Sequence, residues 1–348
     1  MPMERDPRRG SNITASIANL PESLLGDQPS PPPGGGGRAF PTMPGSEFAR
    51  SIYADQARRE VEQLIEELND RRTREQALQG LSKLKEVPDV ALLLWHTSGL
   101  MFMLLREITG VYHLMSTPNL TQEVSNRVCN TITLFQCIAS HLETRKPFIR
   151  ASMPLYLYPF IGTENKDKPH EYLRLSSLGA LGALVKGHPP NRDEVDPEII
   201  HFLLESQRFE NIYVPLNVPA HVLQVATFIV ERILTTDEGL NYCCNFGDRF
   251  YVVTHVLGEM TDKLLEEPSA RLLKLIIKCF LILSKGPRDS EGLRCCIPKS
   301  LTHPNAINLL SGDRDAMRGL QQLLKNVSNG HQVHVSPTGE LVGYLIDG

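Results

Sequence analysis

The chain has 348 residues, of which 41% are hydrophobic, and its formal net charge at pH 7 is −4. This length allows a sizeable core, and the acidic excess argues against a whole-protein affinity for nucleic acid or acidic lipid. No stretch approaches the roughly 18 consecutive apolar residues of a membrane span. The first thirty residues lack the apolar segment of a secretory signal. We therefore expect neither a membrane segment nor a cleaved leader.

The two ends of the chain differ in composition from its middle. Residues 1–50 contain the run from Pro29 to Gly37, which is almost entirely proline and glycine. Such a segment cannot bury enough apolar surface to offset its ordering entropy. The sequence therefore predicts a disordered tail over residues 1–50, an ordered domain over residues 51–327 and a loose C-terminal tail over residues 328–348.

Helical patterns begin near Asp55. Val61, Leu64, Ile65 and Leu68 follow the spacing of one helix face. A capping box starting at Thr73 is expected to open the next helix. A single long apolar helix is then expected from residue 88 to residue 108, followed by another from residue 121 to residue 141.

The apolar helical runs recur along the whole middle of the chain. They close at residues 84–85, 138–140, 184–186, 233–235, 283–285 and 324–325, about every 40–55 residues. This period is typical of stacked helical repeats of the armadillo or HEAT kind. The predicted fold is therefore all-α, a right-handed superhelical solenoid of about six armadillo-like repeats.

Motifs of catalysis and metal binding are missing from the sequence. It contains no phosphate loop, nucleotide-binding glycine fingerprint, nucleophile elbow or H-E-x-x-H. The cysteine count is odd, at seven, and most cysteines lie in apolar runs, which indicates buried thiols in a reducing compartment. The adjacent pairs at 243–244 and 295–296 leave redox or metal chemistry as the alternative, but no histidine or C-x-x-C completes a zinc set. We expect no catalytic residue, no metal and no cofactor.

Basic residues are better organised near residue 270. Arg271, Lys274 and Lys278 are spaced three and four apart, so they share one helix face. They form either an ordinary solvated face or a positive strip that contacts RNA or acidic peptides. The sequence leaves both interpretations open.

Several sequence blocks resemble one known family. They are Ser125–Asn130, Gln136–His141, Leu155–Phe160, Glu171–Gly179 and Glu267–Lys274, in the family's order. The chain resembles the cell-differentiation Rcd family, the Caf-forty-like armadillo-repeat subunit of the CCR–NOT deadenylase complex, over about residues 55–327.

The resemblance implies a non-catalytic adaptor. Such an adaptor docks on the large Not scaffold and recruits mRNA regulators, through tryptophan-containing and short helical motifs, for mRNA deadenylation, decay and translational repression. It implies a cytoplasmic location that includes P-bodies, with the nucleus as a second location. RNA binding and homodimer formation are further properties of the family. The alternative is an armadillo protein that binds RNA directly, outside the complex.

The resemblance also implies two kinds of partner site on particular residues. Arg249 and Arg288 match the arginines of two tryptophan pockets. Gly292 stands where the family has alanine, and Gly247 stands where it has tyrosine. Because the missing ring removes one wall beside Arg249, we expect the pocket of Arg288 and Gly292 to be the stronger.

Two further surfaces follow from the same resemblance. Val225 matches an apolar residue of a concave groove for short helical motifs. His96, Ser98 and Phe102 match the scaffold-binding surface, where Ser98 replaces an aromatic residue and Phe102 an alanine. The two replacements are expected to alter scaffold affinity, and they motivate the RNA-binding alternative.

Overall fold

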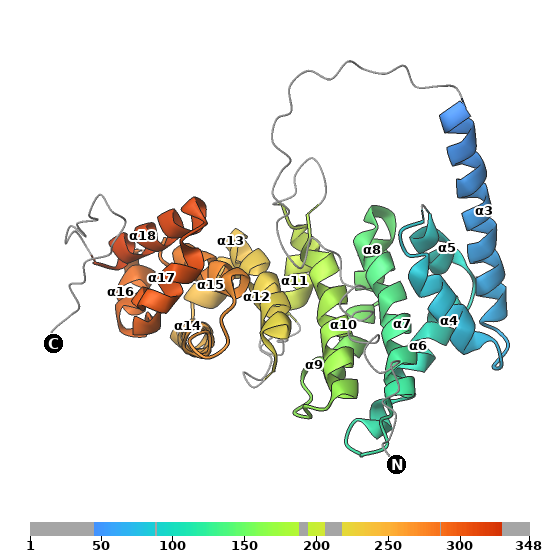
Figure 1. The fold of residues 1–348 in the computed structure, drawn as a ribbon, viewed down its shortest axis with the longest axis horizontal. Helices are drawn as coiled ribbons and strands as arrows, with labels where there is room; N and C mark the ends of the chain where they lie inside the picture. The colour runs from blue at the N-terminus through green and yellow to red at the C-terminus, as the bar shows by residue number, and fades with distance from the viewer. Residues whose placement is uncertain (1–44, 88, 188–193, 206–217, 286, 329–348) are drawn as a thin grey trace, which may run out of the picture. The chain divides into compact units, whose positions relative to one another are not determined.

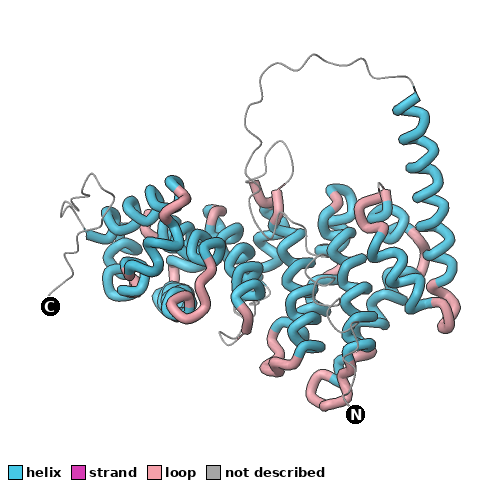
Figure 2. The backbone as a smooth tube through the Cα atoms, viewed as in Figure 1, coloured by secondary structure: helices cyan, strands magenta, loops and turns pink. Residues whose placement is uncertain are grey.

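The computed structural model describes residues 45–87, 89–187, 194–205, 218–285 and 287–328. Within these ranges the regular structure is helical and contains no strand (Figure 2). The chain divides into two compact units, one reaching to Phe202 and one starting at Leu203 (Figure 1). Each unit is described by itself below.

The helices of the two units follow one another with short connections. The first unit contains α3 (Gly45–Glu67), α4 (Arg74–Lys83), α5 (Val90–His96), α6 (Leu100–Thr109), the 3-10 helix η2 (Tyr112–Leu114), α7 (Gln122–Ser140), α8 (Leu142–Arg150), the 3-10 helix η3 (Met153–Leu157), α9 (Tyr158–Ile161) and α10 (Lys168–Val185). Helix α11 (Pro197–Glu205) spans the division between the units. The second unit contains α12 (Ala220–Leu234), α13 (Asp237–Cys244), α14 (Gly247–Lys263), α15 (Ala270–Leu283), α16 (Pro287–Cys296), the 3-10 helix η5 (Lys299–Thr302), α17 (Pro304–Leu310) and α18 (Arg314–Ser328).

Long helices stack on one another inside each unit. In the first unit α4 packs on α7 and α7 packs on α10, as Figure 1 shows in the blue-to-green part of the chain. In the second unit α12 packs on α15 and α15 packs on α18. These helices end within a few residues of the positions at which the sequence pattern closes. Each buries its apolar face against its neighbour, as solenoid repeats do, and the predicted all-α solenoid class is confirmed.

Polar side chains mark where the stacked helices begin. Thr121 accepts a hydrogen bond from the backbone N–H of Val124 at 3.3 Å, and Asp167 accepts one from His170 at 3.1 Å. Such caps satisfy N–H groups that have no partner inside the helix. The predicted cap at Thr73 is wrong. Its hydroxyl instead donates to the carbonyl of Glu67 at 2.7 Å, and its side chain makes no cap bond to α4.

The single helix predicted from residue 88 to residue 108 is also wrong. Gly99 adopts a φ of 77°, which ends the α-helical path and separates α5 from α6. The hydroxyl of Thr97 donates to the carbonyl of Leu93 at 2.6 Å and closes the end of α5. Among the described helices none is by itself long and apolar enough to cross a membrane, and the pair 90–96 and 100–114, bent by 90°, passes by length and composition alone.

The ordered region starts earlier than the predicted boundary at residue 51. Helix α3 begins at Gly45, so residues 45–50 belong to a helix rather than to the tail. At the other end α18 reaches Ser328. The remaining residues of both predicted tails, 1–44 and 329–348, lie outside the described residues.

The cysteines behave as packed thiols. All seven are free, and Cys129, Cys243 and Cys279 are buried. Burial raises the pKa of the Cys129 thiol to about 11 and that of the Cys243 thiol to about 12. Thiols with such pKa values stay protonated at neutral pH, so they are poor nucleophiles and poor metal ligands. Cys295 is exposed.

A glycine fixes the corner between α12 and α13. A Cβ atom added at Gly239 would lie 2.1 Å from the carbonyl oxygen of Ile233, so any larger residue must push the two helices apart. We expect Gly239→Ala to lower the free energy of unfolding by about 1–3 kcal/mol, as overpacking does. Gly247→Ala is the matched control, because nothing lies within 4 Å of its added Cβ. Chemical denaturation measures both, and equal stabilities for the two variants would contradict the expectation.

Thiol labelling tests the burial of the cysteines. At about pH 8 a disulfide reagent should modify Cys295 first, because Cys129, Cys243 and Cys279 are buried and have raised pKa values. Replacing Cys295 by serine should remove the fast phase. Fast reaction of Cys129, identified by mass spectrometry in folded protein, would show that the stack opens around α7.

Candidate functional site

The predicted scaffold-binding residues lie together at the corner between α5 and α6. His96 is the last residue of α5, Ser98 lies in the turn, and both are exposed. Phe102 lies in the first turn of α6 with 69% of its surface exposed. A large apolar side chain left in water beside polar neighbours is typical of a contact surface. The turn at Gly99 therefore brings all three predicted residues to the surface of the first unit.

Trp95 holds this corner on the rest of the unit. Its ring meets that of Phe148 on α8 edge to face, with centroids 6.5 Å apart. Phe148 in turn packs against Phe135 of α7 at 5.2 Å. Such aromatic contacts contribute beyond the area that they bury. Trp95 therefore packs inward and fixes the end of α5, from which His96 reaches the surface.

Arg249 lies on an aromatic platform in the second unit. Its guanidinium carbon is 3.9 Å from the centroid of the Tyr242 ring on α13 and 4.6 Å from that of Phe246. Phe246 precedes α14 and is 59% exposed. Both distances fall within the range of cation–π contacts. The cation is thus held flat between rings, next to an exposed aromatic surface.

The missing ring at Gly247 has less effect than the sequence predicted. Gly247 is exposed and opens α14, and its Cβ position faces open space. The aromatic walls beside Arg249 come from Tyr242 and Phe246 instead. The reasoning from sequence missed these two residues. Their signal was available, because aromatic residues stand seven and three positions before the arginine.

The second tryptophan pocket has a different geometry from the one expected. Gly292 lies in α16, and a Cβ atom added there would be 3.1 Å from Cε1 of Phe250. The space beside Gly292 in that direction is therefore filled by the Phe250 ring, and the glycine serves helix packing. Arg288 belongs to the same helix, but its side chain lies outside the described residues.

The assignment of Val225 to an open groove is not supported. Val225 lies in α12, and none of its side chain is exposed. The residues around it in that helix, from Val222 to Thr227, are also buried. A side chain without solvent-accessible surface cannot contact a partner directly. Val225 therefore belongs to the core of the second unit.

The predicted basic strip on α15 is shorter than its sequence indicates. Arg271 and Lys278 are exposed on one helix face. Lys274 between them forms an ion pair with Asp313, with Nζ and Oδ2 2.5 Å apart. The hydrogen bond from Lys274 holds the pKa of the Asp313 carboxyl below its ordinary value. The charge in the middle of the strip is thus offset by a residue that precedes α18.

Chemistry-bearing clusters are few in the part of the chain that is described. No group of three or more His, Cys, Asp or Glu side chains there is placed to hold a metal ion. The candidate sites are therefore surfaces for macromolecular contact, namely the α5–α6 corner and the aromatic platform around Arg249.

Comparisons with known proteins agree on one family. The family model described as "Cell differentiation family, Rcd1-like" matches residues 64–327. Over 264 residues the chain is 45% identical to the cell differentiation protein rcd1 of Schizosaccharomyces pombe, covering 74% of this chain and 89% of that protein. Over 254 residues it is 39% identical to Protein CAF40 of Saccharomyces cerevisiae, covering 72% and 66%.

A solved structure supports the fold alone. An engineered protein superposes on this chain with a TM-score of 0.50 at 18% identity, covering 78% of this chain and 97% of the engineered one. The family match extends from α3 to α18 and so includes the α5–α6 corner and the Arg249 platform. The resemblance seen in the sequence blocks is confirmed, and the chain belongs to the Rcd1-like cell differentiation family.

Proposed function

We propose that this protein is a non-catalytic adaptor subunit of the CCR–NOT deadenylase complex. It docks on the large Not scaffold and recruits regulators of mRNA, so that their targets are deadenylated, degraded or translationally repressed. It acts in the cytoplasm, including P-bodies, and also in the nucleus. Family membership and the similarity to Protein CAF40 support this assignment.

The observation that carries the proposal is the exposed corner of the first unit. Phe102 is 69% exposed, although an isolated phenylalanine gains by leaving water. His96 and Ser98 supply polar groups beside it. An apolar centre with a polar rim is the usual anatomy of a protein interface. The bulkier residue at position 102 enlarges the apolar centre, which offsets the loss of an aromatic ring at Ser98.

Recruitment of regulators uses the second unit. Arg249 offers a fixed planar cation beside the exposed ring of Phe246. An incoming indole stacks on such a cation and buries on the order of 150–250 Å² of aromatic surface. We therefore assign the principal tryptophan pocket to Arg249. This reverses the order expected from the sequence, because Gly292 is packed on Phe250.

Direct RNA binding outside the complex is the weaker alternative. Its basis was the strip on α15, and the ion pair between Lys274 and Asp313 removes the central cation of that strip. Affinity purification separates the two functions. Recovery of the Not scaffold supports the adaptor, and its absence together with RNA crosslinking supports the alternative.

Phe102→Glu should weaken capture of the Not scaffold. A carboxylate at the centre of a desolvated contact loses the anchor and adds a burial cost. We expect a loss of about 1–3 kcal/mol, or roughly tenfold or more in Kd. Pull-down with purified scaffold measures it.

The matched control is Phe246→Glu, which changes another exposed phenylalanine, in the second unit. It should leave scaffold capture unchanged. If the two glutamate variants capture the scaffold equally well, the α5–α6 corner is not the docking surface.

Arg249→Ala should weaken binding of a tryptophan-containing peptide by about 1–3 kcal/mol, because the stacked cation is lost. Gly292→Ala should have a smaller effect, since its Cβ presses on Phe250 rather than on the ligand. Titration calorimetry with one peptide compares both variants. A larger loss for Gly292→Ala would restore the order of pockets expected from the sequence. Phe102→Glu serves as the control that should retain full peptide affinity.

A further inference from the structure

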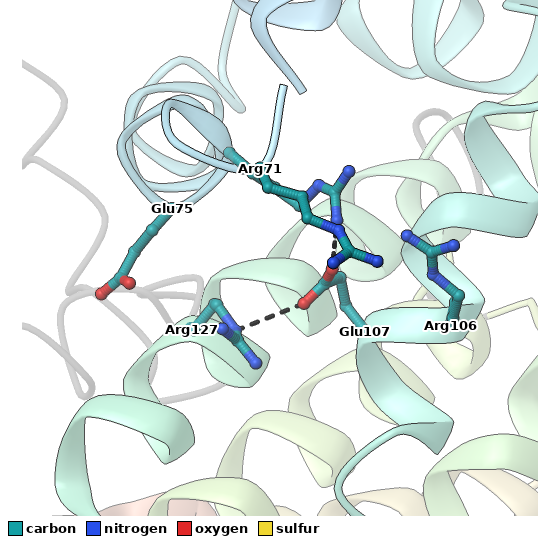
Figure 3. A pocket seen from close by; sticks show the side chains of 6 residues that line it. Arg71, Glu75, Arg106, Glu107 and Arg127 are labelled. Atoms are coloured by element: carbon teal, nitrogen blue, oxygen red, sulfur yellow. Dashed lines mark hydrogen bonds and ion pairs between the residues drawn. The ribbon is translucent and has the colours of Figure 1, made fainter. Parts of the chain in front are cut away.

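A charged pocket lies in the first unit, apart from both surfaces described above. It has a volume of about 480 Å³. Its walls are Arg71, Arg74, Glu75, Arg106, Glu107 and Arg127. These residues come from the turn before α4, from α4 itself, from α6 and from α7 (Figure 3). Four guanidinium groups and two carboxylates leave two positive charges uncompensated.

Glu107 arranges two of the arginines. Its side chain is only 11% exposed, and it accepts a hydrogen bond from Nη1 of Arg74 at 3.3 Å. Nε of Arg127 lies 3.3 Å from its other oxygen. Arg74 is held further by its Nε–H, which donates to the carbonyl of Leu68 at 2.8 Å. The back of the pocket is therefore preorganised before any ligand arrives.

Donors remain for a ligand. Nε of Arg127 is buried and has no hydrogen-bond acceptor among the described residues. The exposed guanidinium groups of Arg71 and Arg106 form no ion pair recorded within the described part of the chain. In Figure 3, Arg106 and Arg127 approach Glu107 from opposite sides, and the carboxylate of Glu75 is turned away from them. The site is thus open to an anion that accepts several hydrogen bonds.

A phosphate monoester fits this charge. It carries about −1.5 to −2 charges and three strong acceptor oxygens, and guanidinium groups bind such oxygens in pairs. We propose that the arginine pocket binds the phosphate group of a phosphorylated serine or threonine in a partner protein. This goes beyond the adaptor function and uses neither the α5–α6 corner nor Arg249.

The distribution of charge favours a single phosphate over an RNA strand. A nucleic acid backbone needs cations that continue from one phosphate to the next. The segment that enters α10, the next helix of the stack, carries three acids against two lysines over residues 164–171. The net charge of −4 adds no general attraction for a polyanion. The positive charge is thus confined to one cavity.

The test uses the full chain and a minimal ligand. N-acetyl-phosphoserine N-methylamide is titrated against the isotope-labelled protein while the arginine Nε–H signals are followed by NMR. The matched unphosphorylated serine amide, inorganic phosphate and a short single-stranded RNA are titrated in parallel. We expect saturable binding of the phosphoserine amide and none of the serine amide. Arg71→Gln combined with Arg106→Gln should weaken it by about tenfold or more, because two charge-assisted contacts are lost.

Arg72→Gln is the matched control. Arg72 adjoins the pocket in sequence, but its side chain is 91% exposed and paired with Asp70, and it does not line the cavity. It should bind like the wild type. Absence of saturable binding, or equal affinity in the double variant, overturns the proposal. Tighter binding of inorganic phosphate than of the phosphoserine amide overturns the assignment to a protein partner. Loss of RNA binding alone in the double variant overturns it in favour of nucleic acid.

Discussion

Stacked helices bury their own ends, and the carbonyl groups at those ends have no partner within the helix. In the first unit Arg145 of α8 solves this problem for two helices at once. It donates to the carbonyl of Ala139 in the last turn of α7 at 3.0 Å and to that of Ala183 in the last turn of α10 at 3.4 Å. Burial lowers the pKa of Arg145 to about 10, so the guanidinium group remains charged at neutral pH and favours the negative ends of both helices.

Other buried cations do the same for the connections between helices. Arg174, which is 1% exposed, donates to the carbonyls of Ile161 and Asn165 and so ties the loop before α10 to the helix itself. In the second unit Nζ of Lys263 donates to the carbonyl of Val218 at 2.6 Å. Because these residues satisfy the backbone from inside, the corners between helices keep fixed shapes. Side chains at the corners, such as Phe102 and Phe246, are then free to serve contacts.

The sequence predicted what depends on local pattern. Apolar spacing located the ends of the stacked helices, since a helix that packs on its neighbours must repeat its apolar face. It did not predict the break at Gly99, because a glycine inside an apolar run is compatible with a continuous helix until its φ is known. Nor could spacing tell that Val225 faces inward, since the helix around it is apolar on every side.

Contacts between distant residues were the other limit. The ion pair of Lys274 with Asp313 joins two different helices, and the arginine pocket gathers Arg74, Glu107 and Arg127 from three. No local pattern marks such groups, because each member alone looks like an ordinary surface charge. The position of Arg249 on Tyr242 is an intermediate case, with partners close in sequence but across a turn.

The close approach at Gly239 also affects how changes in this protein would appear in a living cell. Tyr242 lies one helical turn after Gly239 in α13, and its ring is the surface on which Arg249 lies flat. A residue that moves α13 by a fraction of an ångström therefore tilts the ring and the cation together. In a genetic screen, substitutions at this buried glycine would be scored as loss of a partner, although the glycine touches no ligand.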